Sequence, residues 1–295
     1  MEMIRVALIG LDTSHSIEFT RRMQSPDCEP DLKADGIQAV SCLRFMTPFT
    51  CADILNSRQK QLEQWGVRVT ENFEEAVADC DAIMIEINDP SLHWDYFQKC
   101  ADLHKPIFID KPLADTYENG KKIVDLSRKQ KIPVMSSSSL RFAHAFVEAC
   151  QAVPNPSQVI AFGPLGIPAA GEGLIWYGVH SFEMLQRAMG IGAQCVDARR
   201  DESGVVTIVT YPHSRRGTVV LTENHYAYGG TLIDPESAFP YIVDSSRMYT
   251  EQLKVIVDFF RTGEAPLTLD NTLEVMRLLD AAVASCNSRT PVVLS

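Results

Sequence analysis

The hydrophobic residues of the first half of the chain fall into short, continuous runs separated by amphipathic stretches. Runs rich in β-branched and aromatic residues, without polar alternation, are typical of strands buried on both faces of a parallel sheet. They predict strands at residues 4–10, 36–43, 67–69, 82–87, 107–109 and 132–135. The intervening spacing predicts helices over 17–23, 52–65, 72–78, 92–103 and 113–131. This alternation predicts βαβ units and therefore a Rossmann-like, doubly wound parallel sheet.

The second half follows a different pattern. Four consecutive serines at 136–139 mark a hinge, and alternating apolar positions at 205–211 and 217–223 predict an antiparallel hairpin around a polar turn. Further strands are expected at 158–162 and 226–233. Helices are expected at 142–153, 174–189 and 248–261, with a last helix opened by a capping box at 271–274. We therefore predict two domains: a Rossmann-like domain at 1–137, and an α+β domain at 138–295 with an open, largely antiparallel sheet.

Composition and charge exclude several classes of function. The net charge is −11 and the sequence has no basic cluster, which argues against a nucleic-acid partner. No apolar run approaches the ~18–20 residues that span a bilayer, and the start 1–5 lacks the basic region of a signal peptide. The eight cysteines are scattered without a CxxC pair, as is typical of reduced thiols in a cytosol. These features predict a cytoplasmic protein without a membrane partner.

The loop after the first strand departs from the dinucleotide fingerprint G-x-G-x-x-G. Gly10 matches the first glycine, whereas Asp12 and His15 stand at the second and third. Glycine at the second position lets a pyrophosphate approach the backbone, and Asp12 adds negative charge there. Thr13, Ser14 and the helix N-terminus still offer donors to an anion. The alternative is that Asp12 or Ser14 only caps the helix.

The end of the second strand also differs from the pattern expected for NAD. An acid at this point binds the ribose hydroxyls of NAD, but Arg44 stands here and no acid does. An arginine favours the 2′-phosphate of NADP, although a lone arginine is more often a surface residue. The choice between NAD and NADP therefore stays open.

The strand at 107–109 ends in Asp110-Lys111-Pro112. Proline cannot donate to a sheet ladder, so the strand should end there and leave an ammonium group at the carboxyl edge of the sheet. In open α/β sheets this edge binds ligands. The alternative interpretation is a solvated lysine at a strand end.

Several motifs together resemble the glucose–fructose oxidoreductase, inositol dehydrogenase and rhizopine catabolism family (Gfo/Idh/MocA). The stretch from Asn88 to His93 is similar to the family's T-P-x-x-x-H motif, and Asp110-Lys111-Pro112 is similar to its Glu-Lys-Pro motif. The segment 140–142, Gly178-Val179-His180 and the C-terminal tail also resemble the family, so that the resemblance covers nearly the whole chain.

The resemblance implies an NAD- or NADP-dependent oxidoreductase acting on a sugar, polyol or related small hydroxylated substrate. It implies that the domain at 1–137 binds the dinucleotide, and that the domain at 138–295 binds substrate and forms oligomers. It also implies that Lys111 lies beside nicotinamide and substrate, that the Lys111–Pro112 bond is often cis, and that the chain forms a homo-oligomer, a dimer or a tetramer. Implied cofactor contacts are Gly10, Thr13, Ser14, His15, Arg44, Asn88, His93, Asp110 and Lys111. Implied substrate contacts are Arg141 and Tyr177.

His180 is the second predicted catalytic residue. A histidine titrates near neutrality and can exchange a proton with a hydroxyl group as hydride moves, and we expect it to face one cleft together with Lys111. The family's aspartate four residues earlier is replaced by Trp176. The alternative is a structural histidine bonded to Glu183 or Tyr177. A metal site at His180 and Glu183 lacks a third ligand, so no metal is predicted.

Two other functions remain open. Because Asp12, His15 and Trp176 each replace a group that the family's chemistry uses, the chain could be a degenerate member that binds a ligand or partner as a sensor without turnover. A lyase or glycosidase that recycles its NAD without net oxidation is also compatible with these residues.

Overall fold

The computed structural model describes residues 3–223 and 225–294. Residues 1–2, which belong to the start examined for a signal peptide, lie outside the described residues. The chain divides into two compact units: Met1–Ser136 with Tyr249–Leu269, and Ser137–Met248 with Asp270–Ser295. Within the described ranges, no helix combines the length and apolar character needed to cross a membrane.

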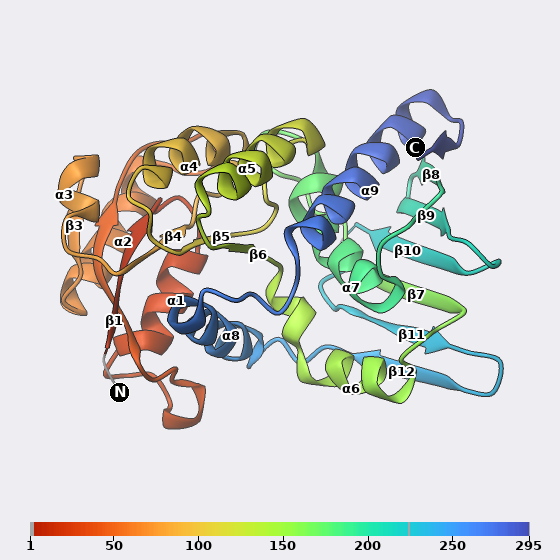
Figure 1. The fold of residues 1–295 in the computed structure, drawn as a ribbon, viewed down its shortest axis with the longest axis horizontal. Coiled ribbons are helices and arrows are strands. Elements are labelled where there is room, and N and C mark those ends of the chain that lie inside the picture. The colour runs from red at the N-terminus through yellow and green to blue at the C-terminus, as the bar shows by residue number, and fades with distance from the viewer. Residues whose placement is uncertain (1–2, 224, 295) are drawn as a thin grey trace. The chain divides into compact units, whose positions relative to one another are not determined.

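The first unit is built on a six-stranded sheet of order β3-β2-β1-β4-β5-β6 (Figure 1). Its recorded strand pairs are all parallel. The strands are β1 (Ile4–Ile9), β2 (Ile37–Leu43), β3 (Arg68–Thr70), β4 (Ala82–Ile85), β5 (Ile107–Ile109) and β6 (Val134–Ser136). β1, β4 and β5 are buried along nearly their whole length, as continuous apolar runs require. The Rossmann-like prediction is confirmed.

Helices connect these strands, and Figure 1 shows α4 and α5 along one side of the sheet with α1 on the other. The helices are α1 (His15–Gln24), α2 (Ala52–Gln64), α3 (Phe73–Val77), α4 (His93–Ala101) and α5 (Tyr117–Gln130), with short 3₁₀ turns η1 (Pro30–Leu32) and η2 (Pro90–Leu92). The helix predicted from residue 113 begins only at Tyr117. The reason is local, because the Thr116 hydroxyl accepts a hydrogen bond from Asn119 N at 3.3 Å and caps the helix there.

A helix from late in the chain, α8 (Met248–Thr262), belongs to the first unit. Thr250 Oγ1 donates to Leu32 O at 2.8 Å, and the Arg22 guanidinium lies 5.2 Å from the centre of the Tyr249 ring. The assignment of all residues after 137 to one second domain is therefore wrong for Tyr249–Leu269. The functional roles assigned to the two domains stay predictions.

The second unit contains a seven-stranded sheet of order β12-β11-β7-β10-β9-β8-β13. Its strands are β7 (Gln158–Pro164), β8 (Cys195–Asp201), β9 (Gly204–Thr210), β10 (Arg216–Thr222), β11 (Gly229–Ile233), β12 (Ala238–Ile242) and β13 (Val292–Val293). Only the recorded pair of β7 and β10 is parallel, and the predicted hairpin is β9 with β10. The prediction of a largely antiparallel sheet is confirmed, although β8, β12 and β13 were missed.

The helical elements of the second unit are a 3₁₀ turn η3 (Ser139–Phe142), α6 (His144–Ala152), a π-helical turn η4 (Leu174–Gly178), α7 (Val179–Met189) and α9 (Leu269–Ser288). α9 begins two residues before the predicted capping box at 271–274. The Glu274 carboxylate instead accepts from the backbone N–H groups of Gly192 and Ala193, both at 3.0 Å. The predicted capping box is therefore wrong, because its acid is bonded to another loop.

Candidate functional site

Gly10 directly follows β1 and has a φ of +111°, a backbone conformation that residues with a side chain rarely adopt. A Cβ atom at this position would clash with the carbonyl oxygen of Glu86. The close approach of β1 to the end of β4 therefore requires this glycine, independently of any phosphate.

Asp12 stands at the second glycine position and is buried. Its Oδ1 accepts from the backbone N–H of Asn88 at 2.9 Å, and its Oδ2 accepts from Thr47 Oγ1 at 2.7 Å. Burial raises the pKa of Asp12, and these hydrogen bonds oppose that rise. Asp12 therefore joins the ends of β1 and β4 to the segment after β2, and the alternative that it caps α1 is wrong.

The start of α1 offers donors to an anion. Ser14 occupies the N-cap position but its hydroxyl makes no capping bond, so that alternative is wrong as well. Thr13 Oγ1 accepts from His15 N at 3.2 Å. The N–H groups of Thr13 and Ser14 donate no hydrogen bond within the described part of the chain. Free amides at a helix N-terminus are the donor set that a pyrophosphate uses, so these residues fit the phosphates of a dinucleotide.

Two arginines of the first unit differ in what they contact. Arg44 donates to the side chains of Gln59 and Asn56 on α2, the latter at 2.8 Å, so both of its terminal nitrogens are engaged. Arg58, also on α2, donates through Nη1 to Leu11 O at 3.0 Å. Sequence reasoning missed Arg58, because only the fold brings a residue in the middle of α2 to the loop after β1.

Three ionisable side chains converge where β4 and β5 end. The His15 Nδ1 and Asp110 Oδ2 atoms lie 2.6 Å apart, and the Glu86 carboxylate completes the group. Burial raises the pKa of Glu86 well above its ordinary value, and the Asp110 charge adds to this rise. Burial also pushes the pKa of Asp110 upward, but His15 and Lys111 outweigh it and hold that pKa at about 2. Asp110 is therefore ionised near pH 7, whereas burial favours the neutral form of Glu86.

Lys111 follows Asp110 at this edge and is half-buried. Its peptide bond to Pro112 is cis, as the family resemblance implied. Among the described residues, its ammonium group has no hydrogen-bond or ion-pair partner within reach. Burial lowers the pKa of Lys111, while Asp110 and Glu86 raise it. Its half-burial and lowered pKa argue against the alternative of a solvated lysine at a strand end.

His93 has a structural environment. It is fully buried, with Nε2 2.8 Å from Ile87 O and Nδ1 3.2 Å from Leu113 O. The ring thus connects the segment after β4 to the segment after Lys111. The prediction that His93 contacts the cofactor directly gives way to this positioning role, because carbonyl groups of the chain face both ring nitrogens.

In the second unit, His180 lies near the start of α7. Its Nδ1 is 2.6 Å from Ser138 Oγ, and its ring meets those of Tyr177 and Tyr228 edge-on, with centroids 6.2 and 5.4 Å away. Ser138 is one of the four serines expected to form a hinge. It supplies the orienting partner that sequence reasoning sought in an acid at position 176 or at Glu183.

Arg141 and Glu183 form a buried ion pair instead of facing a ligand. Arg141 is 5% exposed and donates through Nη1 to Glu183 Oε2 and through Nη2 to Gln186 Oε1, both at 2.7 Å. Burial raises the pKa of Glu183, and Arg141 opposes that rise. The prediction of a substrate contact at Arg141 is corrected to a structural link between η3 and α7.

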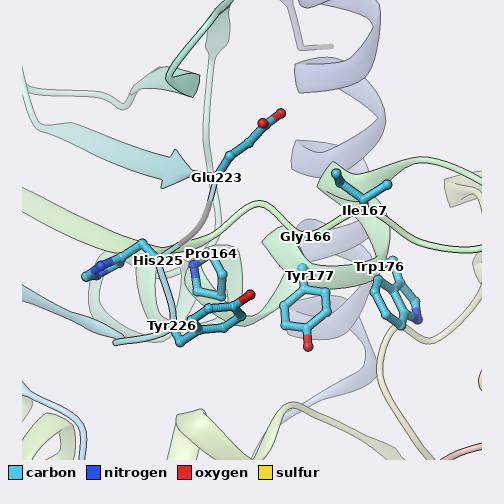
Figure 2. Close-up of a pocket in the computed structure, with 8 residues that line it drawn as sticks. All are labelled: Pro164, Gly166, Ile167, Trp176, Tyr177, Glu223, His225 and Tyr226. Carbon is cyan, nitrogen blue, oxygen red and sulfur yellow. The ribbon is translucent and has the colours of Figure 1, made fainter.

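A cavity of about 320 Å³ opens beside the π-helical turn of the second unit (Figure 2). Tyr177, a predicted substrate contact, and its neighbour Trp176 line it, and their ring centroids are 4.6 Å apart. The rest of the lining is Pro164, Gly166, Ile167, Glu223, His225 and Tyr226. Aromatic rings with a few polar groups suit a small hydroxylated ligand. The segment after β10 was not predicted to contribute, because no local signal sets it apart.

Comparison with known proteins gives a family match for the first half of the chain. Residues 4–138 match the model of the Gfo/Idh/MocA oxidoreductase family, described as having an NAD-binding Rossmann fold. YceM of Salmonella typhimurium (strain LT2), which is named as an oxidoreductase, is 25% identical over 95 residues. That match spans 31% of this chain and 31% of the relative's length.

Solved structures resemble the chain over its whole length. GenD2 from gentamicin A biosynthesis, solved with NAD, has a TM-score of 0.80 at 13% identity and covers 100% of this chain and 97% of its own. A myo-inositol dehydrogenase from Corynebacterium glutamicum has a TM-score of 0.80 at 14% identity, with 99% of both chains covered. The scyllo-inositol dehydrogenase of Lactobacillus casei with NAD(H) and scyllo-inositol also has a TM-score of 0.80, at 12% identity and 99% coverage of both. At these identities the similarity shows a shared fold.

Proposed function

We propose that this protein is an NAD- or NADP-dependent dehydrogenase of a sugar, polyol or related hydroxylated compound, because residues 4–138 match the model of the Gfo/Idh/MocA oxidoreductase family with its NAD-binding Rossmann fold. The observation that carries the proposal is the ammonium group of Lys111, which has no partner among the described residues and stands at the carboxyl end of β5. This edge is where open α/β sheets bind dinucleotides and substrates. The inositol dehydrogenases with the same fold support this substrate class.

The first unit would hold the cofactor. The free amides of Thr13 and Ser14 suit its phosphates, and the cation of Arg58 beside Leu11 adds positive charge near the same loop. When bound, the nicotinamide supplies the hydride acceptor. Asp12 is already engaged with Asn88 N and Thr47 Oγ1, so its carboxylate does not need to compete for the amides of α1.

Residues of the chain itself would carry out the proton transfer. Lys111 can hold or polarise the reacting hydroxyl group through its unpaired amine. His180 can take up the released proton, with its ring oriented by Ser138 Oγ at Nδ1 and by the rings of Tyr177 and Tyr228. The cavity lined by Tyr177 and Trp176 would bind the hydroxylated ring of the substrate.

Titration with NADH and NADPH, followed by nucleotide fluorescence, tests the cofactor. We expect saturable binding of at least one of the two, and absence of binding of both at millimolar concentration would refute the proposal. A screen of cyclitols and sugars should then give net NADH or NADPH formation. NAD-dependent turnover without net reduction would indicate the lyase or glycosidase alternative.

Substitution at Lys111 tests the catalytic assignment. Lys111→Ala should lower kcat by about 10²–10⁴-fold while dinucleotide binding persists, because a general acid or base contributes on this scale. Lys129→Ala, at an exposed lysine in the last turn of α5, is the matched control and should leave kcat unchanged.

One observation favours a second candidate, a sensor that binds dinucleotide without turnover. Trp176 stands four residues before His180 and lines the cavity instead of supplying an acid. Dinucleotide binding by the wild type without oxidation of any cyclitol or sugar would support this candidate over the dehydrogenase.

A further inference from the structure

We propose that His15, Glu86 and Asp110 form a binding site for a divalent first-row transition-metal ion. The three side chains come from the start of α1 and from the ends of β4 and β5. The sequence predicted no metal ligands, because these residues are far apart along the chain and form no spaced motif. The proposal does not depend on the dehydrogenase activity, and its test measures the ion itself.

The donor atoms are close enough to share one ion. One ligand atom from each residue lies within 4.8 Å of the other two. Nitrogen and oxygen ligands at about 2.0–2.2 Å from an ion are themselves about 3–4.4 Å apart, depending on the coordination geometry. Small side-chain movements would therefore bring the three donor atoms to the separations found between the ligands of one ion. The His15 Nδ1 to Asp110 Oδ2 contact of 2.6 Å would widen as an ion replaces the shared proton, or the ring would bind through Nε2.

Glu86 provides an independent observation that points to a ligand. Glu86 is 0% exposed, and neither of its carboxylate oxygens has a hydrogen-bond partner among the residues that the structure describes. Buried polar groups in native proteins are almost always paired, and one left unpaired costs free energy. A metal ion between Glu86, His15 and Asp110 would satisfy this carboxylate. Asp12, another buried acid at this edge, differs in that both of its carboxylate oxygens accept hydrogen bonds.

Backbone hydrogen bonds and ring packing hold the three ligand residues in place without a bound ion. Glu86 N donates to Ile9 O at 2.8 Å, and Asp110 N donates to Ile85 O at 2.9 Å. The His15 ring packs edge-on against Phe19 and Tyr249, with centroids 5.9 and 5.1 Å away. Such support around the ligands is what fixes their orientation in metal sites.

The ligand types select the class of ion. One imidazole and two carboxylates suit Zn²⁺, Mn²⁺, Fe²⁺ or Co²⁺, whereas Mg²⁺ and Ca²⁺ prefer an all-oxygen shell. Two carboxylates match the charge of a divalent ion, and the neighbouring Lys111 cation moderates the affinity. The other pair considered from sequence, His180 with Glu183, does not compete, because Glu183 is paired with Arg141.

The test uses the full-length chain, treated with a chelator and then titrated with Co²⁺, followed by visible absorption, and with Zn²⁺, followed by calorimetry. We expect one ion per chain, and no comparable heat from Mg²⁺. Glu86→Gln keeps the shape of the side chain and should weaken Co²⁺ binding by more than about tenfold, since even residues behind the ligands cost 10–100-fold. Asp110→Asn should do the same, and serves if Glu86→Gln does not fold.

The matched control is His144→Ala. His144 Nε2 and Glu148 Oε1 form an exposed pair 3.2 Å apart on α6, which could bind an ion adventitiously. We expect this substitution to leave Co²⁺ binding unchanged. The proposal is overturned if the wild type takes up no Co²⁺ or Zn²⁺ at about 100 µM, if His144→Ala abolishes binding, or if the folded Glu86→Gln and Asp110→Asn variants bind as the wild type does.

Discussion

Asp12 and Glu183 are acids whose roles were decided by the partners that the fold brought to them. Asp12 was expected either to repel a phosphate or to cap α1, yet it binds Asn88 N and Thr47 Oγ1. Glu183 was considered as a partner of His180, yet it pairs with Arg141. Neither result could be predicted from local sequence, because the partners of Asp12 are 76 and 35 residues away and Arg141 is 42 residues from Glu183.

A surface ion pair gives a prediction at the scale of single residues. Arg5 Nη2 and Asp81 Oδ1 lie 3.1 Å apart at the beginnings of β1 and β4, and both side chains are nearly half exposed. The side-chain hydrogen bond from Arg5 lowers the pKa of Asp81. The stabilisation by Asp81 is therefore present above the ordinary carboxyl pKa of about 4 and is lost as the pH falls through the lowered value.

Urea unfolding of the wild type and Asp81→Asn at several pH values measures this effect. At pH 7 we expect Asp81→Asn to lower the free energy of unfolding by about 0.2–1 kcal/mol, because solvent screens an exposed pair. The difference should vanish once the pH lies below the lowered pKa of Asp81. A difference that grows towards low pH would contradict the assigned sign.

At the scale of elements, the apolar runs predicted every strand of the parallel sheet, because a strand buried on both faces leaves a continuous signal in the sequence. Helix starts were less predictable. α5 begins four residues later than its periodicity suggested, where Thr116 caps it. Three strands of the second sheet were missed, of which β13 has only two residues. β8 carries charged residues at exposed positions, and β12 contains Pro240, so neither strand forms a continuous apolar run in the sequence.

The cap of α5 gives a prediction for this element. Thr116→Ala removes the acceptor for Asn119 N and should lower the free energy of unfolding by about 1 kcal/mol, the usual cost of losing an N-cap. Thr116→Ser keeps an acceptor and should retain most of the stability. Equal unfolding midpoints for the Ala variant and the wild type in urea would show that the hydroxyl does not cap the helix.

At the scale of the whole molecule, one face of the seven-stranded sheet carries exposed apolar side chains. Ile160 on β7 and Ile208 on β9 are more than a third exposed, and Ile242 on β12 is 62% exposed. Strand pairing aligns Ile208 with Thr218, and Thr218 with Ile160, so two of these side chains share one row of the sheet. An open sheet face with exposed apolar side chains is typical of an interaction surface.

We propose that a second copy of the chain covers this face. Light scattering coupled to size-exclusion chromatography should show a dimer or tetramer for the wild type. Ile208→Lys, in the middle of the face, should shift the population towards monomer. His144→Lys adds the same charge on the exposed surface of α6 and should leave the assembly unchanged. A monomeric wild type at about 100 µM would contradict the proposal.

The sequence alone determined the Rossmann-like parallel sheet, the hairpin of the second sheet and the position of Lys111 after a buried strand. These features follow from the periodicity of apolar residues and from the inability of proline to continue a strand, which act over a few neighbouring residues. Only the tertiary structure decided the partners of Asp12, the Ser138 contact of His180, the unpaired carboxylate of Glu86 and the placement of α8 in the first unit. Side-chain partners and packing depend on which distant segments of the chain come into contact. Patterns over a few neighbouring residues do not determine those contacts.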